Sequence, residues 1–89
     1  MLKKYNKLPS YPYSLIAVMN DRQFLILLGS RIKKMRLKKD LSQYELAVLC
    51  HFQKASMSRI EAGKSNITLL NLKRISVALH VHVNELLSD

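Results

Sequence analysis

The sequence predicts an all-α fold of about five helices. Apolar residues recur at intervals of three and four positions between Leu25 and Met35, a spacing that is typical of one buried helix face. Residues that favour helix caps, such as Ser42 and Thr68, stand just before further apolar-periodic runs. No alternation of apolar and polar residues is long enough to indicate a strand. The chain has 89 residues, enough for one small domain with a modest core, which dimerisation would help to stabilise.

The charge of the chain is strongly basic. Fifteen Lys and Arg residues against six Asp and Glu residues give a formal net charge of +9 and a pI near 10.0. This balance favours a polyanionic partner, either nucleic acid or an anionic membrane surface. A basic surface that only maintains solubility is the alternative that charge alone leaves open.

Cysteine content and apolar runs indicate the compartment. Cys50 is the one cysteine, which excludes an internal disulfide and fits a reducing compartment. Its place on an apolar helix face predicts a core residue, not a nucleophile. The run Phe24–Leu28 has five apolar residues, far short of the roughly 18 of a membrane span. We therefore expect a cytoplasmic protein with no membrane partner.

Residues 1–20 differ in character from the rest and are expected to form an N-terminal extension to a domain of residues 21–89. The prolines Pro9 and Pro12 exclude a regular helix through residues 8–13. We expect a flexible or loosely docked tail. The alternative is an arm that carries lysines and tyrosines to a DNA backbone or to a partner chain.

The first helix of the domain is expected from Asp21, as its cap, to about Lys39. A core stripe is formed by residues at intervals of three and four positions, namely Leu25, Leu28, Ile32 and Met35. The other faces are basic and carry Arg31, Lys33, Lys34, Lys38 and Lys39.

The stretch from Leu41 to Gly63 predicts two short helices joined by a tight turn. Ser42 and Glu45 have the spacing of a capping box at the start of the first helix. The pattern breaks at residues 51–52, and a second helix begins at about Gln53. Each helix has residues expected to face inward, and these are Leu46, Ala47, Cys50, Met57 and Ile60. The outward arc of the second helix mixes short and basic side chains, which suits a DNA groove, and consists of Lys54, Ala55, Ser56, Ser58 and Arg59.

Two further helices are predicted after Gly63. Thr68 caps a helix that ends at about Leu79, where His80 is expected in a left-handed conformation. A short last turn covers residues 84–87. The inner face of the longer helix is expected to hold Leu69, Leu72, Ile75 and Leu79. Apolar residues left over near the C-terminus are candidates for a dimer interface, with ordinary small-domain packing as the alternative, and they are Leu70, Val77, Val81, Val83 and Leu87.

With these helices in place, residues 28–87 resemble the Cro/C1-type (Xre-type) helix-turn-helix domain. The resemblance is carried by LGSRIKKMRLKKDLSQYELA, then SRIEAGKSNITLLNLKRISVAL, then VHVNELL, and it covers about sixty residues. It implies a compact five-helix bundle of the lambda-repressor-like helix-turn-helix type. Phage repressors, restriction–modification controller proteins and stand-alone bacterial regulators share this domain, and the short chain is most similar to the last two groups.

The resemblance also implies roles for individual residues. The positions that face DNA bases are matched by Lys54, Ala55, Ser56 and Arg59. Phosphate contacts are expected from Gln43, Ser58, Lys64 and Ser65. Arg36 and Glu61 match a pair that forms a structural salt bridge between the first and third helices.

The sequence departs from the family in the turn and in the short helix before it. His51 stands where glycine is common in the turn, and Gln53 replaces a small capping residue, so the second short helix is expected to begin a residue early or late. Val48 and Leu49 occupy positions that are usually polar, which suggests a packing surface for the N-terminal extension or for another chain.

The leading hypothesis is a sequence-specific DNA-binding transcriptional regulator, a homodimeric repressor that binds an inverted-repeat operator through the major groove. The alternative is an antitoxin-like protein-interaction module with a protein partner. We expect no catalytic residues, no metal site, no cofactor and no small-molecule substrate. His80 and His82 lack further ligands at metal-site spacing and are expected to serve in a loop or a cap.

Overall fold

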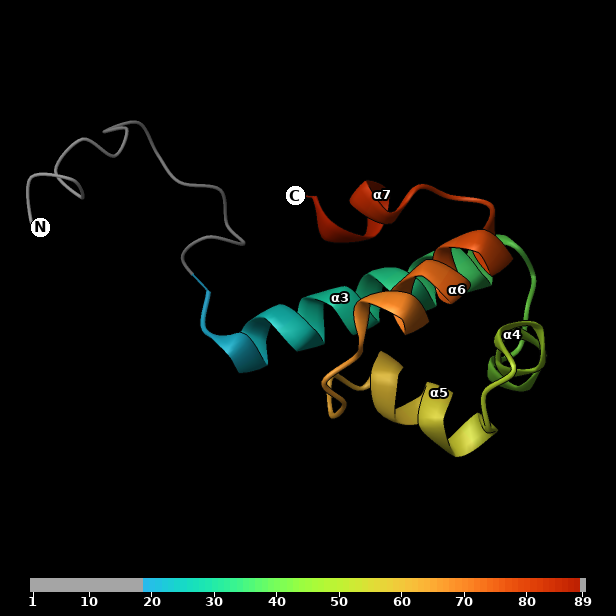
Figure 1. The fold of residues 1–89 in the computed structure, drawn as a ribbon, viewed down its shortest axis with the longest axis horizontal. Coiled ribbons are helices and arrows are strands. Elements are labelled where there is room, and N and C mark those ends of the chain that lie inside the picture. The colour runs from blue at the N-terminus through green and yellow to red at the C-terminus, as the bar shows by residue number, and fades with distance from the viewer. Residues whose placement is uncertain (1–18, 89) are drawn as a thin grey trace, which may run out of the picture.

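Five helices form the part of the chain that the computed structural model describes, residues 19–88 (Figure 1). In chain order they are α3 (Asp21–Lys38), α4 (Gln43–Cys50), α5 (Lys54–Glu61), α6 (Leu69–Leu79) and α7 (Val83–Leu87). These residues contain no strand, and the all-α, five-helix prediction is confirmed. The predicted extension, residues 1–20, lies outside the described residues except for its last two positions.

The core lies between the long helix α3 and the helices that pack against it. In Figure 1, α6 runs alongside α3, α5 lies below this pair, α7 lies above it, and α4 stands at the end far from the start of α3. Every helix contributes buried apolar side chains, and these are Leu28, Ile32, Leu46, Ala47, Cys50, Met57, Ile60, Leu72, Ile75, Leu79 and Leu86. All five residues of α4 and α5 that were predicted to face inward are among them.

The start of α3 differs from the prediction by one residue. Asn20, not Asp21, is the N-cap: its Oδ1 accepts a hydrogen bond of 2.8 Å from the Gln23 N–H, and Gln23 Oε1 accepts one of 3.1 Å from the Asn20 N–H. Asp21 lies in the first turn, where its negative charge interacts favourably with the helix dipole. Two adjacent residues could each cap this helix, and the extended backbone at position 20 decides between them.

In α6 the prediction for Leu69 was wrong. The side chain is 74% exposed, and the buried face of α6 consists of Leu72, Ile75, Ser76 and Leu79. Leu69 is the first residue of the helix, and its side chain lies at the rim of a hollow instead of in the core. Thr68 is the N-cap as predicted, since its Oγ1 accepts a hydrogen bond of 3.1 Å from the Asn71 N–H.

The helices α3 to α6 all end in the same way. One or two positions after each helix ends, one residue has a left-handed backbone, and these residues are Asp40, His51, Gly63 and His80. The next N–H donates back to a carbonyl five positions earlier, as in the 2.8 Å bond from the Phe52 N–H to the Ala47 oxygen, which is the Schellman arrangement. Only one of the four positions is glycine, so the backbone conformation is imposed at the other three against the preference of the residue.

Candidate nucleic-acid interface

The helices α4 and α5 and the turn between them form the centre of the candidate site. Ser42 caps α4 as predicted: its Oγ accepts a hydrogen bond of 3.0 Å from the Glu45 N–H, and Glu45 Oε1 accepts one of 2.9 Å from the Ser42 N–H. The hydrogen bond from the Ser42 N–H, and after it the bond with the Ser42 hydroxyl, lower the pKa of the Glu45 carboxyl below its ordinary value. In the turn, His51 adopts φ 60° and ψ 36°, the conformation that a glycine would adopt easily. The turn therefore keeps its geometry without glycine, and α5 begins at Lys54.

The two faces of α5 differ sharply in exposure. Met57 and Ile60 are buried in the core, while the predicted base-contacting residues Lys54, Ala55, Ser56 and Arg59 are all exposed. Ala55 and Arg59 are four positions apart and lie one above the other on the exposed face. Ser56 lies about 100° further around the helix, and Ser58 is half-buried. On the exposed face, the short side chain of Ala55 lies between the cations Lys54 and Arg59. A side chain this short allows the helix backbone to approach a groove floor closely.

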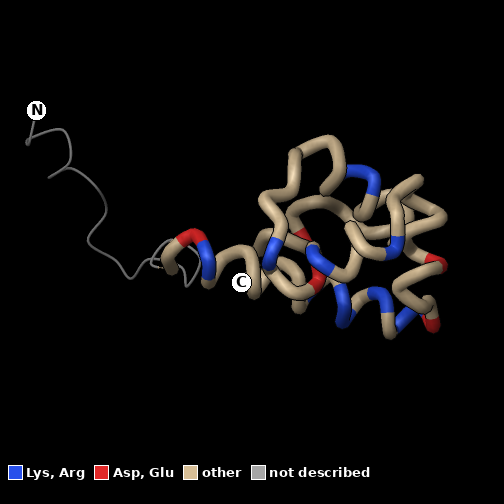
Figure 2. The backbone as a smooth tube through the Cα atoms, turned by 90° about the horizontal axis from the view of Figure 1, so that it is seen from below, with Lys and Arg blue, Asp and Glu red and all other residues tan. Residues whose placement is uncertain are grey.

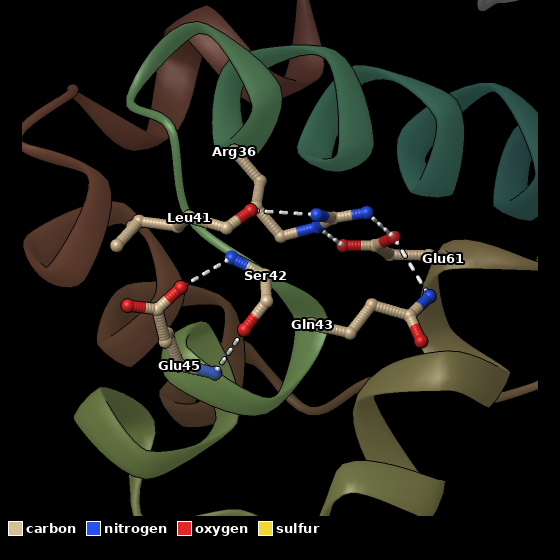
Figure 3. Close-up of polar contacts among 6 residues, drawn as sticks. All are labelled: Arg36, Leu41, Ser42, Gln43, Glu45 and Glu61. Carbon is tan, nitrogen blue, oxygen red and sulfur yellow. Dashed lines mark hydrogen bonds and ion pairs between the residues drawn. The ribbon is translucent and has the colours of Figure 1, made fainter.

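A buried ion pair joins α5 to α3 and to the residue before α4. Arg36 Nε donates to Glu61 Oε2 at 2.7 Å, and its Nη2 donates to Glu61 Oε1 at 3.0 Å (Figure 3). The third guanidinium nitrogen, Nη1, donates at 2.7 Å to the carbonyl oxygen of Leu41, just before α4. Only 7% and 2% of the two charged side chains is exposed. The structure therefore contains the structural salt bridge expected for Arg36 and Glu61.

Gln43 belongs to the same network, which the sequence did not predict. Its Nε2 donates to Glu61 Oε1 at 3.0 Å (Figure 3). A side-chain amide carries two N–H donors, so one remains available after this bond. Gln43 is also the first residue of α4, where unpaired backbone N–H groups and the helix dipole favour an anion. Glu61 thus holds in place a side chain that was expected to contact a phosphate.

The loop after α5 is fixed against α3. Gly63 has φ 72°, and a Cβ atom there would lie 2.7 Å from the Cα atom of Ile26. Gly29 allows a similar approach between α3 and the end of α5, because a Cβ there would lie 2.4 Å from the Ile60 oxygen. Lys64 is exposed directly after this contact, and its N–H donates to the Arg59 oxygen at 2.9 Å. The predicted phosphate-contacting Lys64 and the half-buried Ser65 therefore follow the exposed face of α5 without a break.

Charge on the described part of the chain is predominantly positive, as Figure 2 shows for the backbone positions of Lys and Arg against those of Asp and Glu.

The cysteine and the two histidines near the C-terminus have structural positions. Burial raises the pKa of the Cys50 thiol to about 11, so this residue is a protonated core side chain at neutral pH. His80 ends α6 and His82 precedes α7, so both stand at helix ends as predicted. Within residues 19–88, no three His, Cys, Asp or Glu side chains gather closely enough to hold a metal ion.

The predicted dimer candidates fall into two groups. Leu70 and Val77 on α6 are 69% and 63% exposed. The other three, Val81, Val83 and Leu87, are partly buried and pack against the core of their own chain. An open hollow of about 630 Å³ between α4 and α6 is lined by Leu49, Cys50, Leu70, Lys73, Arg74 and Val77. The exposed Leu49 of α4 thus shares one surface with the two exposed residues of α6, a grouping that sequence spacing could not reveal.

Comparison with known proteins identifies the family. A helix-turn-helix family model, HTH_3, matches residues 32–86, more than half of the chain. The chain belongs to this helix-turn-helix family. The Cro/C1-type resemblance is confirmed, and as a family member the chain is a DNA-binding transcription regulator. In the described residues, no helix is long and apolar enough to cross a bilayer.

Individual relatives give more detail. The control protein C.MunI from Mycoplasma sp. is 42% identical over 72 residues, 80% of this chain and 95% of that protein. The restriction–modification controller protein C.AhdI from Aeromonas hydrophila is 32% identical with a TM-score of 0.69, over 70% of this chain and 94% of that one. SinR, a master regulator for biofilm formation, was crystallised in complex with DNA and is 35% identical with a TM-score of 0.66, over 68% and 98% of the two chains. These relatives are regulators, and they give no support to an enzymatic function or to the antitoxin alternative.

Proposed function

We propose that this helix-turn-helix protein is a sequence-specific, homodimeric repressor that binds an inverted-repeat operator, in the manner of a restriction–modification controller protein. One observation carries the proposal: α5 exposes Lys54, Ala55 and Arg59, and the buried ion pair of Arg36 and Glu61 anchors the same helix. A helix that must fit a major groove needs a fixed angle to its neighbours. The ion pair supplies that angle, because it links α5 to α3 and to the residue before α4.

The side chains on α5 match the chemistry of base edges in the major groove. Arg59 can donate two hydrogen bonds at once, to O6 and N7 of a guanine. Lys54 can donate to O6 and N7 of a guanine from its ammonium group, which acts as a point charge. Ala55 lies between them and contacts a thymine methyl group. Each good bidentate pair discriminates by about 1–3 kcal/mol against a wrong base, so Arg59 carries most of the specificity in each half-site.

Phosphate contacts flank this face at two points. Gln43 and the free N–H groups at the start of α4 bind one phosphate, where the helix dipole adds to the attraction. Ser58, Lys64 and Ser65 bind the backbone near the other end of α5. These contacts fix the register of α5 in the groove and make the affinity depend on salt.

A second copy of the chain covers the apolar hollow between α4 and α6. Leu49, Leu70 and Val77 form an exposed apolar surface that a second copy would remove from water. We expect a two-fold axis through this surface to bring two copies of α5 to successive major grooves, about 34 Å apart. The other candidates, Val81, Val83 and Leu87, pack against the core of their own chain and contribute less to this surface. An operator with two inverted half-sites follows from that symmetry.

In-vitro selection from random duplex DNA at near-physiological salt tests the proposal. The wild-type protein is expected to enrich an inverted repeat whose half-sites lie about one helical turn apart. Arg59→Ala should relax one position in each half-site while the repeat spacing stays the same. Selection of no common sequence, with binding that vanishes as salt rises, would refute specific operator recognition.

A further inference from the structure

A hollow with a basic lining lies beyond the end of α5. It has a volume of about 650 Å³ and is lined by residues from the first two turns of α3 and from the loop between α5 and α6, including Arg22, Ile26, Gly63, Lys64 and Asn66. Arg22 lies outside residues 32–86, which match the family model. The match to the family model therefore assigns no role to this part of α3.

The geometry of the hollow is fixed by backbone contact. Gly63 lies so close to α3 that a Cβ atom would be 2.7 Å from both Cα and Cγ1 of Ile26. Arg22 is four positions before Ile26 and thus lies one helical turn away on the same face of α3. Lys64 directly follows Gly63. Arg22 of α3 and Lys64 of the loop therefore line the same hollow, and the contact between Gly63 and Ile26 fixes the two segments that carry them.

The charge of this space is positive. Arg22 and Lys64 are both exposed, and among residues 19–88 neither forms an ion pair with a carboxylate. Within the same range, the N–H groups of Ser65 and Asn66 donate no hydrogen bond, so further donors are present in the loop. Asp21 lines a neighbouring hollow, with Phe24 and Leu69, and is not among the residues that line this one. Two cations and free N–H donors are the groups that bind phosphate oxygens.

The hollow lies next to the proposed DNA-contacting face. The Lys64 N–H donates to the carbonyl oxygen of Arg59, the last exposed cation of α5, at 2.9 Å. Figure 1 shows the loop after α5 below the N-terminal half of α3, on the side where α5 lies. A duplex in contact with α5 would continue past this loop and present its next backbone phosphate to the hollow.

We propose that Arg22 and Lys64 together bind a DNA backbone phosphate that flanks the half-site. This inference rests on the proposed function, and it assigns to the start of α3 a contact outside the family-matched residues. The contact reads no base. It lengthens the footprint of each protomer and adds one salt-sensitive contact per protomer.

The test uses Arg22→Gln and two versions of the selected operator, one with long flanks and one trimmed to the ends of the half-sites. On the long duplex, Arg22→Gln should lower the slope of log affinity against log salt by about 1 per protomer, or about 2 for the dimer. On the trimmed duplex, wild type and variant should bind equally. Lys34→Gln is the matched control, because it removes the same charge from an exposed position on α3 that does not line the hollow.

Several outcomes would overturn the inference. These are an Arg22→Gln effect that is absent, that equals the effect of Lys34→Gln, or that is the same on both duplexes. A free-anion site would appear differently: millimolar inorganic phosphate would shift the amide NMR signal of Asn66, and the defect would not depend on flank length. Failure of the proposed function is distinguishable, because wild-type protein would then select no inverted repeat at all.

Discussion

Glu61 is the residue on which the arrangement of α3, α4 and α5 depends most. Its carboxylate accepts two hydrogen bonds from Arg36 and one from Gln43, and its side chain is almost fully buried. Buried ion pairs contribute little net stability compared with apolar packing, but the loss of one partner leaves the other charge uncompensated. Glu61 therefore serves mainly to fix geometry, at a position where substitution is costly.

Glu61→Ala should lower the free energy of unfolding by about 3–5 kcal/mol, because the Arg36 guanidinium would stay buried without its carboxylate. Gln43→Ala removes one hydrogen bond to the Glu61 carboxylate and should lower the free energy of unfolding by about 1.5–3 kcal/mol. Urea denaturation followed by circular dichroism measures both. Lys33→Ala, at an exposed position in the middle of α3, is the control. Equal stability of Glu61→Ala and wild type would show that the pair does not hold the helices together.

At the scale of single elements, the turn between α4 and α5 shows how an unfavourable residue is accommodated. His51 adopts a left-handed backbone that costs a residue with a Cβ atom about 1–2 kcal/mol. The hydrogen bond from the Phe52 N–H to the Ala47 oxygen and the burial of Cys50 beside it hold the turn in this conformation. The same turn sets where α5 begins.

His51→Gly should stabilise the protein by about 1 kcal/mol, since glycine adopts φ 60° without steric cost. For a domain of this size the melting temperature should rise by about 4–8 °C. His51→Val, with a branched Cβ, should lower it by at least as much. Thermal unfolding of the three proteins is the measurement. A lower melting temperature for His51→Gly than for wild type would mean that the imidazole makes a stabilising contact of its own.

Local signals in the sequence were sufficient for most elements. The capping bonds of Ser42, Glu45 and Thr68 join residues only three positions apart in the sequence. Met57 and Ile60 repeat at helix spacing. Predicting the helix starts and the buried face of α5 therefore needed no information about how the helices pack. Asn20 was missed because Asp21 beside it is an equally good cap. Leu69 was misplaced because helical periodicity does not show where the core ends along a helix axis.

The site was predictable in part for the same reason. The exposed arc of α5 follows from its own periodicity and from the family resemblance. The bond from Gln43 to Glu61 joins residues 18 positions apart, and the grouping of Leu49 with Leu70 joins two helices. Both depend on interhelical angles, which periodicity within one helix does not contain. The contact of Gly63 with Ile26 is of this kind as well.

At the scale of the whole molecule, the proposed dimer would connect the single site to an operator. Leu70→Lys or Val77→Lys should weaken self-association about 30-fold or more, which corresponds to the loss of about 2 kcal/mol at a central interface residue. Sedimentation equilibrium measures this constant. Leu69→Lys is a matched control, because Leu69 is also exposed on α6 but does not line the hollow between α4 and α6. If Leu69→Lys disrupts the dimer and the other two do not, the interface lies elsewhere.

The central claim is that α5 contacts base edges in the major groove from two positions related by symmetry. Guanine N7 faces the major groove, so protection of this atom from methylation on the selected operator tests the claim most directly. We predict two protected guanines about one helical turn apart on one face of the duplex, and loss of this protection in Arg59→Ala. Guanines that stay reactive while backbone cleavage is suppressed would contradict it, because the protein would then bind phosphates without entering the groove.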